Sequence, residues 1–211
     1  MMPSTVRLPF LILCTCATIA AIASIAAGPR PLPAQDEAET MTFELDPVHC
    51  MANFRVQHMG AGMFWGRFNA VSGTIDTKDD GRVPLSFDVS IDVDSIDTGT
   101  EKLDRTLMSP NFFDEKEFST ITFKSTSVKP VADRDGVYTV AGDLTLLGMT
   151  KPIEATIELT GVNGNPVMKK AGYEAIFTIK RSDYGMEWGV KNGALGDEVR
   201  LIVGLEGDWT A

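Results

Sequence analysis

The feature that most constrains this chain is an alternation of apolar and polar residues with a period of two. Every odd-numbered residue from Leu85 to Val93 is apolar, and the residues between them are Ser or Asp. Because successive side chains of a β-strand point to opposite faces, such a segment predicts a half-buried strand. The pattern recurs eight times and predicts strands at residues 50–58, 64–77, 84–94, 120–128, 137–147, 153–159, 172–181 and 198–207.

Residues that tolerate positive φ separate these segments and predict turns between antiparallel neighbours. They are Asp80-Gly81, Asp135-Gly136, the stretch Gly161 to Gly164, and the pair Gly193 and Gly196. One segment has a different period. Residues 98–108 contain helix formers with Leu103 and Leu107 four apart, followed by Pro110, which predicts one short helix in an otherwise all-β chain.

Eight antiparallel strands can close into a barrel, which removes exposed strand edges, or stack as a sandwich. An outer-membrane barrel is disfavoured, because the polar face carries many charges and the three Trp and three Tyr residues form no girdle near strand ends. We therefore expect a water-soluble, eight-stranded antiparallel barrel. Its interior is either filled by side chains or holds one small ligand.

The first part of the chain has a different character. Residues 8–29 carry no charge, follow Arg7 and are rich in Ala and Ser, a pattern typical of a secretory signal peptide. We predict a signal peptide at 1–27, with the cleavage site open, and an uncleaved membrane anchor as the alternative. A proline-containing linker at 28–40 and a barrel domain at 41–211 are expected to follow.

Charge and cysteine usage exclude several functions. Residues 1–34 hold two of the 19 basic side chains and none of the 29 acidic ones, so the chain from Gln35 carries a net charge of −12. This acidity argues against a nucleic-acid or anionic-membrane partner. Only Cys50 lies outside the predicted signal peptide, so the exported protein is expected to have no internal disulfide and no multi-cysteine metal site.

Candidate catalytic residues are few. The chain has two histidines, His49 and His58, and their separation of nine puts them on opposite faces of a regular strand. The simpler interpretation is that His49 closes a turn after Asp46-Pro47, that His58 ends a strand and that Cys50 is buried. We predict no enzymatic activity, no catalytic cofactor and no metal site; an enzyme that uses both histidines is the alternative.

Four segments, in this order, carry a specific resemblance. They are DPVHCMANFRVQHMGAGMFWGRF (46–68), SIDTGTEKLDRTLMSPNFFDEKEFSTITFKSTSV (95–128), GDLTLLGMTKPIEA (142–155) and KRSDYGM (180–186). Together they resemble the YceI family of periplasmic, polyisoprenoid-binding, lipocalin-like proteins. The resemblance spans nearly all of residues 42–207.

The resemblance implies a lipocalin-like barrel with a helix inserted after the SIDTG segment, and a periplasmic location. It also implies an apolar tunnel that holds an isoprenoid lipid or an isoprenoid quinone for transport or storage. Membrane-bound donor or acceptor proteins and a homodimer are further expectations. Cys50, Leu103, Thr106 and Leu147 replace the residues usual in the family; the loss of basic residues from the helix favours a ligand with a neutral head.

Eleven phenylalanines supply much of the expected tunnel wall. We take the aromatic and aliphatic face of each strand as inward, because the opposite face is rich in Asp, Lys, Ser and Thr. The predicted ligand-binding residues are Phe54, Val56, Phe68, Phe87, Val89, Phe112, Phe113, Phe123, Leu144, Leu146, Phe177 and Leu201. The alternative to a lipid carrier is a stress-response interaction module with a filled interior.

Overall fold

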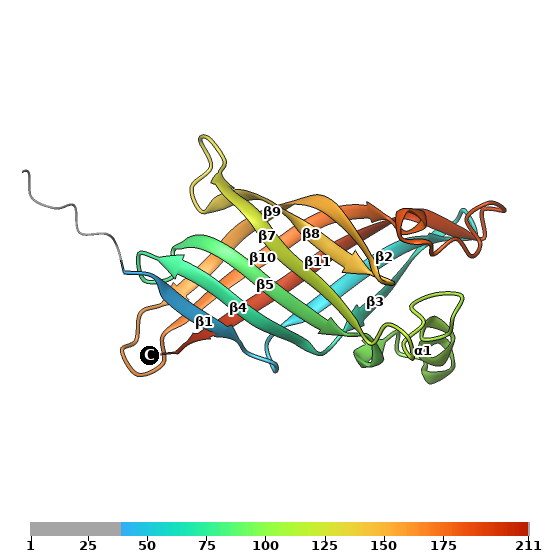
Figure 1. Ribbon diagram of the computed structural model, residues 1–211, viewed down its shortest axis with the longest axis horizontal. Coiled ribbons are helices and arrows are strands. Elements are labelled where there is room, and N and C mark those ends of the chain that lie inside the picture. Colours follow the sequence, from blue (N-terminus) through green and yellow to red (C-terminus); the bar gives the residue numbers. More distant parts are fainter. Residues whose placement is uncertain (1–38, 211) are drawn as a thin grey trace, which may run out of the picture. The chain divides into compact units, whose positions relative to one another are not determined.

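The computed structural model describes residues 39–210; the predicted signal peptide and most of the predicted linker lie outside the described residues. The described part contains eleven β-strands, one α-helix and two short 3₁₀ helices (Figure 1). The strands are β1 (Met41–Leu45), β2 (Met51–His58), β3 (Gly62–Phe68), β4 (Val71–Lys78), β5 (Val83–Asp92), β6 (Ile96–Asp97), β7 (Thr120–Pro130), β8 (Val137–Leu146), β9 (Met149–Asn163), β10 (Lys170–Lys180) and β11 (Leu195–Trp209). The helices are η1 (Val93–Ser95), α1 (Glu101–Leu107) and η2 (Arg181–Tyr184).

The strand segments fill eight positions around a closed antiparallel barrel. β1 and β2 pair with successive parts of the long strand β11, so together they occupy one position. β3 and β4 lie beside them as a second bent strand, and β5 with β6 forms the third. The chain then adds β7, β8, β9, β10 and β11 in order, and the pairing of β1 with β11 closes the ring. The predicted eight-stranded barrel with one inserted helix is therefore confirmed.

One end of the barrel interior is solid. Phe43 of β1, Ile75 of β4 and Tyr173 of β10 are almost completely buried. The Tyr173 hydroxyl donates a hydrogen bond of 2.6 Å to the Gly81 carbonyl in the β4–β5 turn, and the Tyr173 ring meets Phe87 edge-on at 5.6 Å. These contacts tie the turn to the barrel wall and fill this end with aromatic side chains.

The predicted element boundaries were wrong at several places. β1 and the two-residue strand β6 were not predicted, and the helix is shorter than residues 98–108. Gly161 and Gly196 lie inside β9 and β11, not in turns. Both lie next to shifts in the strand register, so these glycines mark β-bulges, where the regular pairing is interrupted. Among the described residues, no helix is long and apolar enough to cross a membrane.

Candidate ligand-binding chamber

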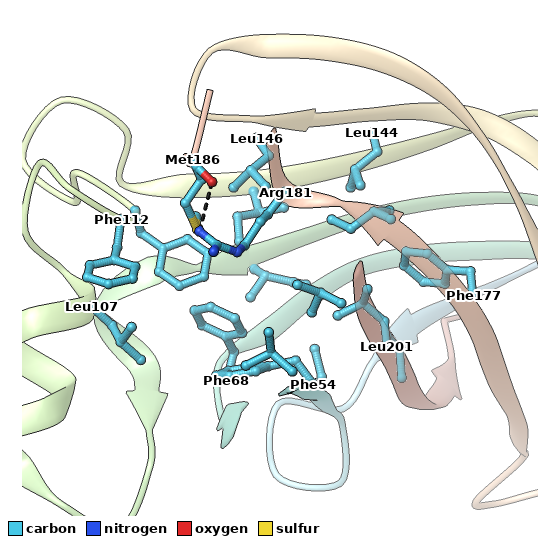
Figure 2. Close-up of a pocket in the computed structure, with 18 of the residues that line it drawn as sticks. Phe54, Phe68, Leu107, Phe112, Leu144, Leu146, Phe177, Arg181, Met186 and Leu201 are labelled. Atoms are coloured by element: carbon cyan, nitrogen blue, oxygen red, sulfur yellow. Dashed lines mark hydrogen bonds between the residues drawn. The ribbon is translucent and has the colours of Figure 1, made fainter. Parts of the chain in front are cut away.

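The end of the barrel near α1 is hollow. It contains a chamber with about 820 Å³ of space free of protein atoms, part of it at the open mouth. All the residues that line it are apolar except Arg181. Figure 2 shows Phe54, Phe68 and Leu201 on one side of this space and Leu144 and Leu146 of β8 on the other. The cavity volume that is comparable with those of other binding sites is about 110 Å³, less than the roughly 300–1,000 Å³ of sites for drug-sized ligands.

A second chamber continues the first toward the solid end. It has about 510 Å³ of free space, and Thr122 is the one polar residue that lines it. The two chambers share wall residues, which come from strands β5, β7, β8, β10 and β11: Ile91, Ile121, Leu144, Phe177 and Val203. The two chambers are therefore neighbours within one apolar interior, which extends from near α1 to Phe87.

The structure brings the twelve predicted residues together around this space. Nine line the first chamber: Phe54, Val56, Phe68, Phe112, Phe113, Leu144, Leu146, Phe177 and Leu201. Phe87, Val89 and Phe123 line the second, where Leu144 and Phe177 also lie. The inward face chosen from the alternation is thus the face that lines the chambers; its contact with a ligand stays a prediction.

Sequence reasoning missed several lining residues. Ile91, Ile121, Ile179 and Val199 lie two residues from predicted members on their own strands, so the same alternation could have identified them. Arg181 ends the predicted strand 172–181 two residues after Ile179, but its charge set it apart from the apolar face. Met186 lies beyond that strand and had no such signal.

Arg181 is 2% exposed and forms one side of the chamber near its mouth. Its Nε donates to the Gly196 carbonyl at 2.7 Å, and Nη1 donates to the Met186 carbonyl at 2.8 Å (Figure 2). Nη2 donates to the carbonyls of Trp188 and Leu195 at 2.8 and 3.0 Å. Burial lowers the pKa of the guanidinium, which still carries its charge at any physiological pH. Arg181 therefore fastens the segment 186–196 to the end of β10.

Two aromatic contacts arrange the segments around the mouth. Phe112, which follows α1, packs against Trp188 with ring centroids 5.3 Å apart. Phe113 meets Phe68 of β3 edge-on, also at 5.3 Å. Phe112 is buried, whereas Trp188 is about half exposed. The mouth is thus bordered by two segments from distant parts of the chain, one anchored by Arg181 and one by phenylalanines.

A charged cluster lies at the turn between β1 and β2. Lys170 Nζ lies 3.1 Å from Asp46, 3.0 Å from Glu206 and 2.8 Å from Asp208. His49 Nδ1 lies 2.7 Å from Asp46, and this hydrogen bond lowers the pKa of Asp46 and raises that of His49. Asp46, His49 and Glu206 offer atoms close enough to hold a metal ion, and the Lys170 ammonium forms ion pairs with both of these carboxylates.

The two histidines lie at opposite ends of β2. His49 precedes the strand and His58 ends it, which puts them about 25 Å apart at about 3.3 Å per residue. The alternative of an enzyme site formed by both imidazoles is therefore wrong. As expected, His49 lies in the turn after Asp46 and hydrogen-bonds to that carboxylate. Cys50 is buried, as expected, and its Sγ lies 3.3 Å from the Glu206 carbonyl oxygen.

The fold and its chambers define a class: closed antiparallel barrels with an apolar interior cavity. The family model described as a YceI-like domain matches residues 43–207. The chain is 34% identical to Protein YceI of Escherichia coli O157:H7 over 160 residues, which cover 75% of this chain and 81% of that protein. The chain belongs to the YceI family.

Solved structures show the same fold. The structure of Burkholderia cenocepacia BcnA matches with a TM-score of 0.67 and 22% identity, covering 77% of this chain and 98% of BcnA. A polyisoprenoid binding domain from Saccharophagus degradans, implicated in plant cell wall breakdown, matches with a TM-score of 0.61 and 18% identity, covering 80% of this chain and 98% of that domain.

Proposed function

We propose that this protein binds an isoprenoid lipid, with the apolar tail inside the barrel, and that it transports or stores this lipid in the periplasm. The observation that carries the proposal is the apolar interior: two neighbouring chambers with shared walls and one charged side chain among their lining residues. The similarity in fold to a domain described as polyisoprenoid-binding supports it.

The energetics favour a long tail. Each CH₂ group moved from water into such a space contributes about 0.8 kcal/mol. A few isoprene units therefore outweigh the lost freedom of the bound molecule, about 4–15 kcal/mol, without a strong polar anchor. Because the two chambers share walls, we expect a long linear chain to extend from one into the other.

The chamber fits a ligand with an uncharged head, such as an isoprenoid quinone. Arg181 is the one cation that lines the space, and four of its hydrogen bonds already go to backbone carbonyls. It therefore has little donor capacity left for a phosphate or a carboxylate. The net charge of −12 beyond residue 34 also repels anionic lipids from the surface.

Mass spectrometry of organic extracts tests the proposal on protein expressed with its export segment and isolated from the periplasm. We expect an isoprenoid lipid in near-stoichiometric amount. Leu201→Trp places a large ring in the chamber and should reduce the retained lipid at least fivefold. Ile202→Trp is the matched control, because its side chain points to the outer face of the same strand, and it should retain the lipid.

Two outcomes contradict the proposal. One is a protein that repeatedly yields no lipid, which favours the stress-response interaction module as the alternative. The other is equal retention by both tryptophan variants, which would mean that any lipid binds elsewhere. Fractionation of the cells tests the location independently, and we expect the processed chain in the periplasmic fraction.

A further inference from the structure

The barrel wall has a seam where two neighbouring strands stop pairing. β9 and β10 are paired from Lys170 as far as Ile176, which lies opposite Thr156, and no pairing continues beyond that point. Both strands nevertheless extend further, β9 back to Met149 and β10 on to Lys180. Their other edges remain fully paired, to β8 and to β11. In the described part of the barrel, the seam thus leaves two strand edges unpaired toward each other.

The local sequence is consistent with this separation. Continuing the register would put Lys180 opposite Pro152. Proline has no backbone N–H and is found at sheet edges rather than in fully paired strands. The unpaired edges expose backbone donors and acceptors that a polar group could use.

The seam connects the outer surface to the interior. An outer groove runs along it and is lined by residues of both strands. Ile153 lines this groove and also the second chamber, and Ile179 lines the groove and also the first chamber. Each of these two isoleucines therefore borders the groove and also borders a chamber.

A tyrosine with an unsatisfied hydroxyl lines the same groove. Tyr184 of η2 lines the groove, is 2% exposed, and has a hydroxyl with no hydrogen-bond partner among the described residues. A buried polar group without a partner costs about 1–3 kcal/mol and calls for an explanation. The buried Tyr138 and Tyr173 hydroxyls, by contrast, both donate to backbone carbonyls.

We propose that the β9–β10 seam is the subsite for the polar head of the ligand, and that the Tyr184 hydroxyl hydrogen-bonds an uncharged carbonyl or hydroxyl oxygen of that head. The inference rests on the proposed function, because the tail then lies in the chambers and passes between Ile153 and Ile179. Burial is the main cause that raises the pKa of Tyr184, so the phenol stays neutral and keeps its proton for donation. The charged groups around the groove are of both signs, Lys151 and Lys180 against Glu154, Asp183 and Glu198, and favour no net charge on the head.

The test compares two fluorescent rod-shaped probes that differ in polarity. All-trans-retinol is an isoprenoid with a hydroxyl head, and diphenylhexatriene has no polar atom. For Tyr184→Phe in the otherwise intact chain, we expect the Kd of retinol to rise about three- to tenfold, the effect of one lost hydrogen bond. The Kd of diphenylhexatriene should not change. The thermal midpoint of the unliganded variant should equal or exceed that of the parent, because the lost hydroxyl had no partner.

Tyr138→Phe is the matched control, since it removes a hydroxyl that donates to the Arg82 carbonyl at 3.1 Å, beside the β4–β5 turn. We expect it to leave the affinities for both probes unchanged. Equal weakening of both probes by Tyr184→Phe, or no change in either, would overturn the head subsite. A parent protein that binds neither probe and yields no lipid would instead refute the proposed function itself.

Discussion

The two ends of the barrel are built from the same alternating pattern, yet one is solid and the other hollow. At the solid end Phe43, Ile75 and Tyr173 are buried to 1% exposure or less. At the hollow end Phe54, Phe68 and Leu201 line the first chamber, whose cavity volume is about 110 Å³. Alternation therefore determines which side chains point inward. Whether these side chains pack together or leave a cavity depends on the size of the side chains on the opposite wall.

Small residues permit the close packing of the solid end. An added Cβ at Gly207 would lie 2.8 Å from the Phe43 Cβ, and one at Gly81 would lie 2.9 Å from the tip of the Phe43 ring. At the hollow end, the mouth is bordered by the segment 186–196, which Arg181 holds at the rim rather than in the interior. Close packing at the solid end stabilises the fold, whereas the hollow end leaves apolar space that side chains do not fill.

The largest effect should come from truncating the solid end. Phe43→Ala leaves a cavity in a packed core and should lower the free energy of unfolding by about 3–5 kcal/mol. Phe54→Ala enlarges a space that is already open on one side of the ring, and should cost about 1–3 kcal/mol. Denaturant unfolding of the unliganded proteins measures both. Equal losses would show that the two ends are packed alike.

Removing the anchor at the mouth should have the next largest effect. Arg181→Met deprives four backbone carbonyls of their donor and should lower the free energy of unfolding by about 2–4 kcal/mol. Arg200→Met, on the exposed outer face of β11, is the control and should change it by less than about 0.5 kcal/mol. If the two variants prove equally stable, Arg181 is not what holds the segment 186–196.

A smaller effect is expected from the tyrosine at the solid end. Tyr173→Phe leaves the Gly81 carbonyl without its buried donor and should lower the free energy of unfolding by about 1–2 kcal/mol. Tyr184→Phe, near the hollow end, should lower it not at all. Thermal unfolding of the two variants side by side measures the contrast, and destabilisation by Tyr184→Phe would reveal a partner for its hydroxyl.

The smallest effect should be a dependence of stability on pH near neutrality. Asp46 raises the pKa of His49 above its ordinary value of 6.5 in the folded protein. The stabilisation is fully present below pH 6.5 and is lost as the pH rises through the raised pKa. We expect the thermal midpoint to fall slightly from pH 6 to pH 8, and His49→Gln to flatten this dependence. An unchanged slope in the variant would assign the dependence to another group.

The predicted part of the structure is the part governed by short-range patterns. Alternation identified the inward face, and ten of the twelve predicted residues line the chambers because each strand keeps its period of two; Phe112 and Phe113 follow α1. The bulges at Gly161 and Gly196 were predicted as turns, because glycine is common at both. Arg181 was not predicted as a site residue because it is charged, and Met186 and Tyr184 were not because they lie beyond the alternating segment that ends at Arg181.

The sequence by itself determined eight alternating strand segments and the residues that share a face, because side-chain direction in a strand depends only on position along the chain. Tertiary structure alone decided that the interior is solid at Phe43 and hollow at Phe54, and that β9 and β10 separate beyond Ile176. Those outcomes depend on distances between side chains that are remote in the sequence. A pattern read along one strand contains no information about the wall that faces it.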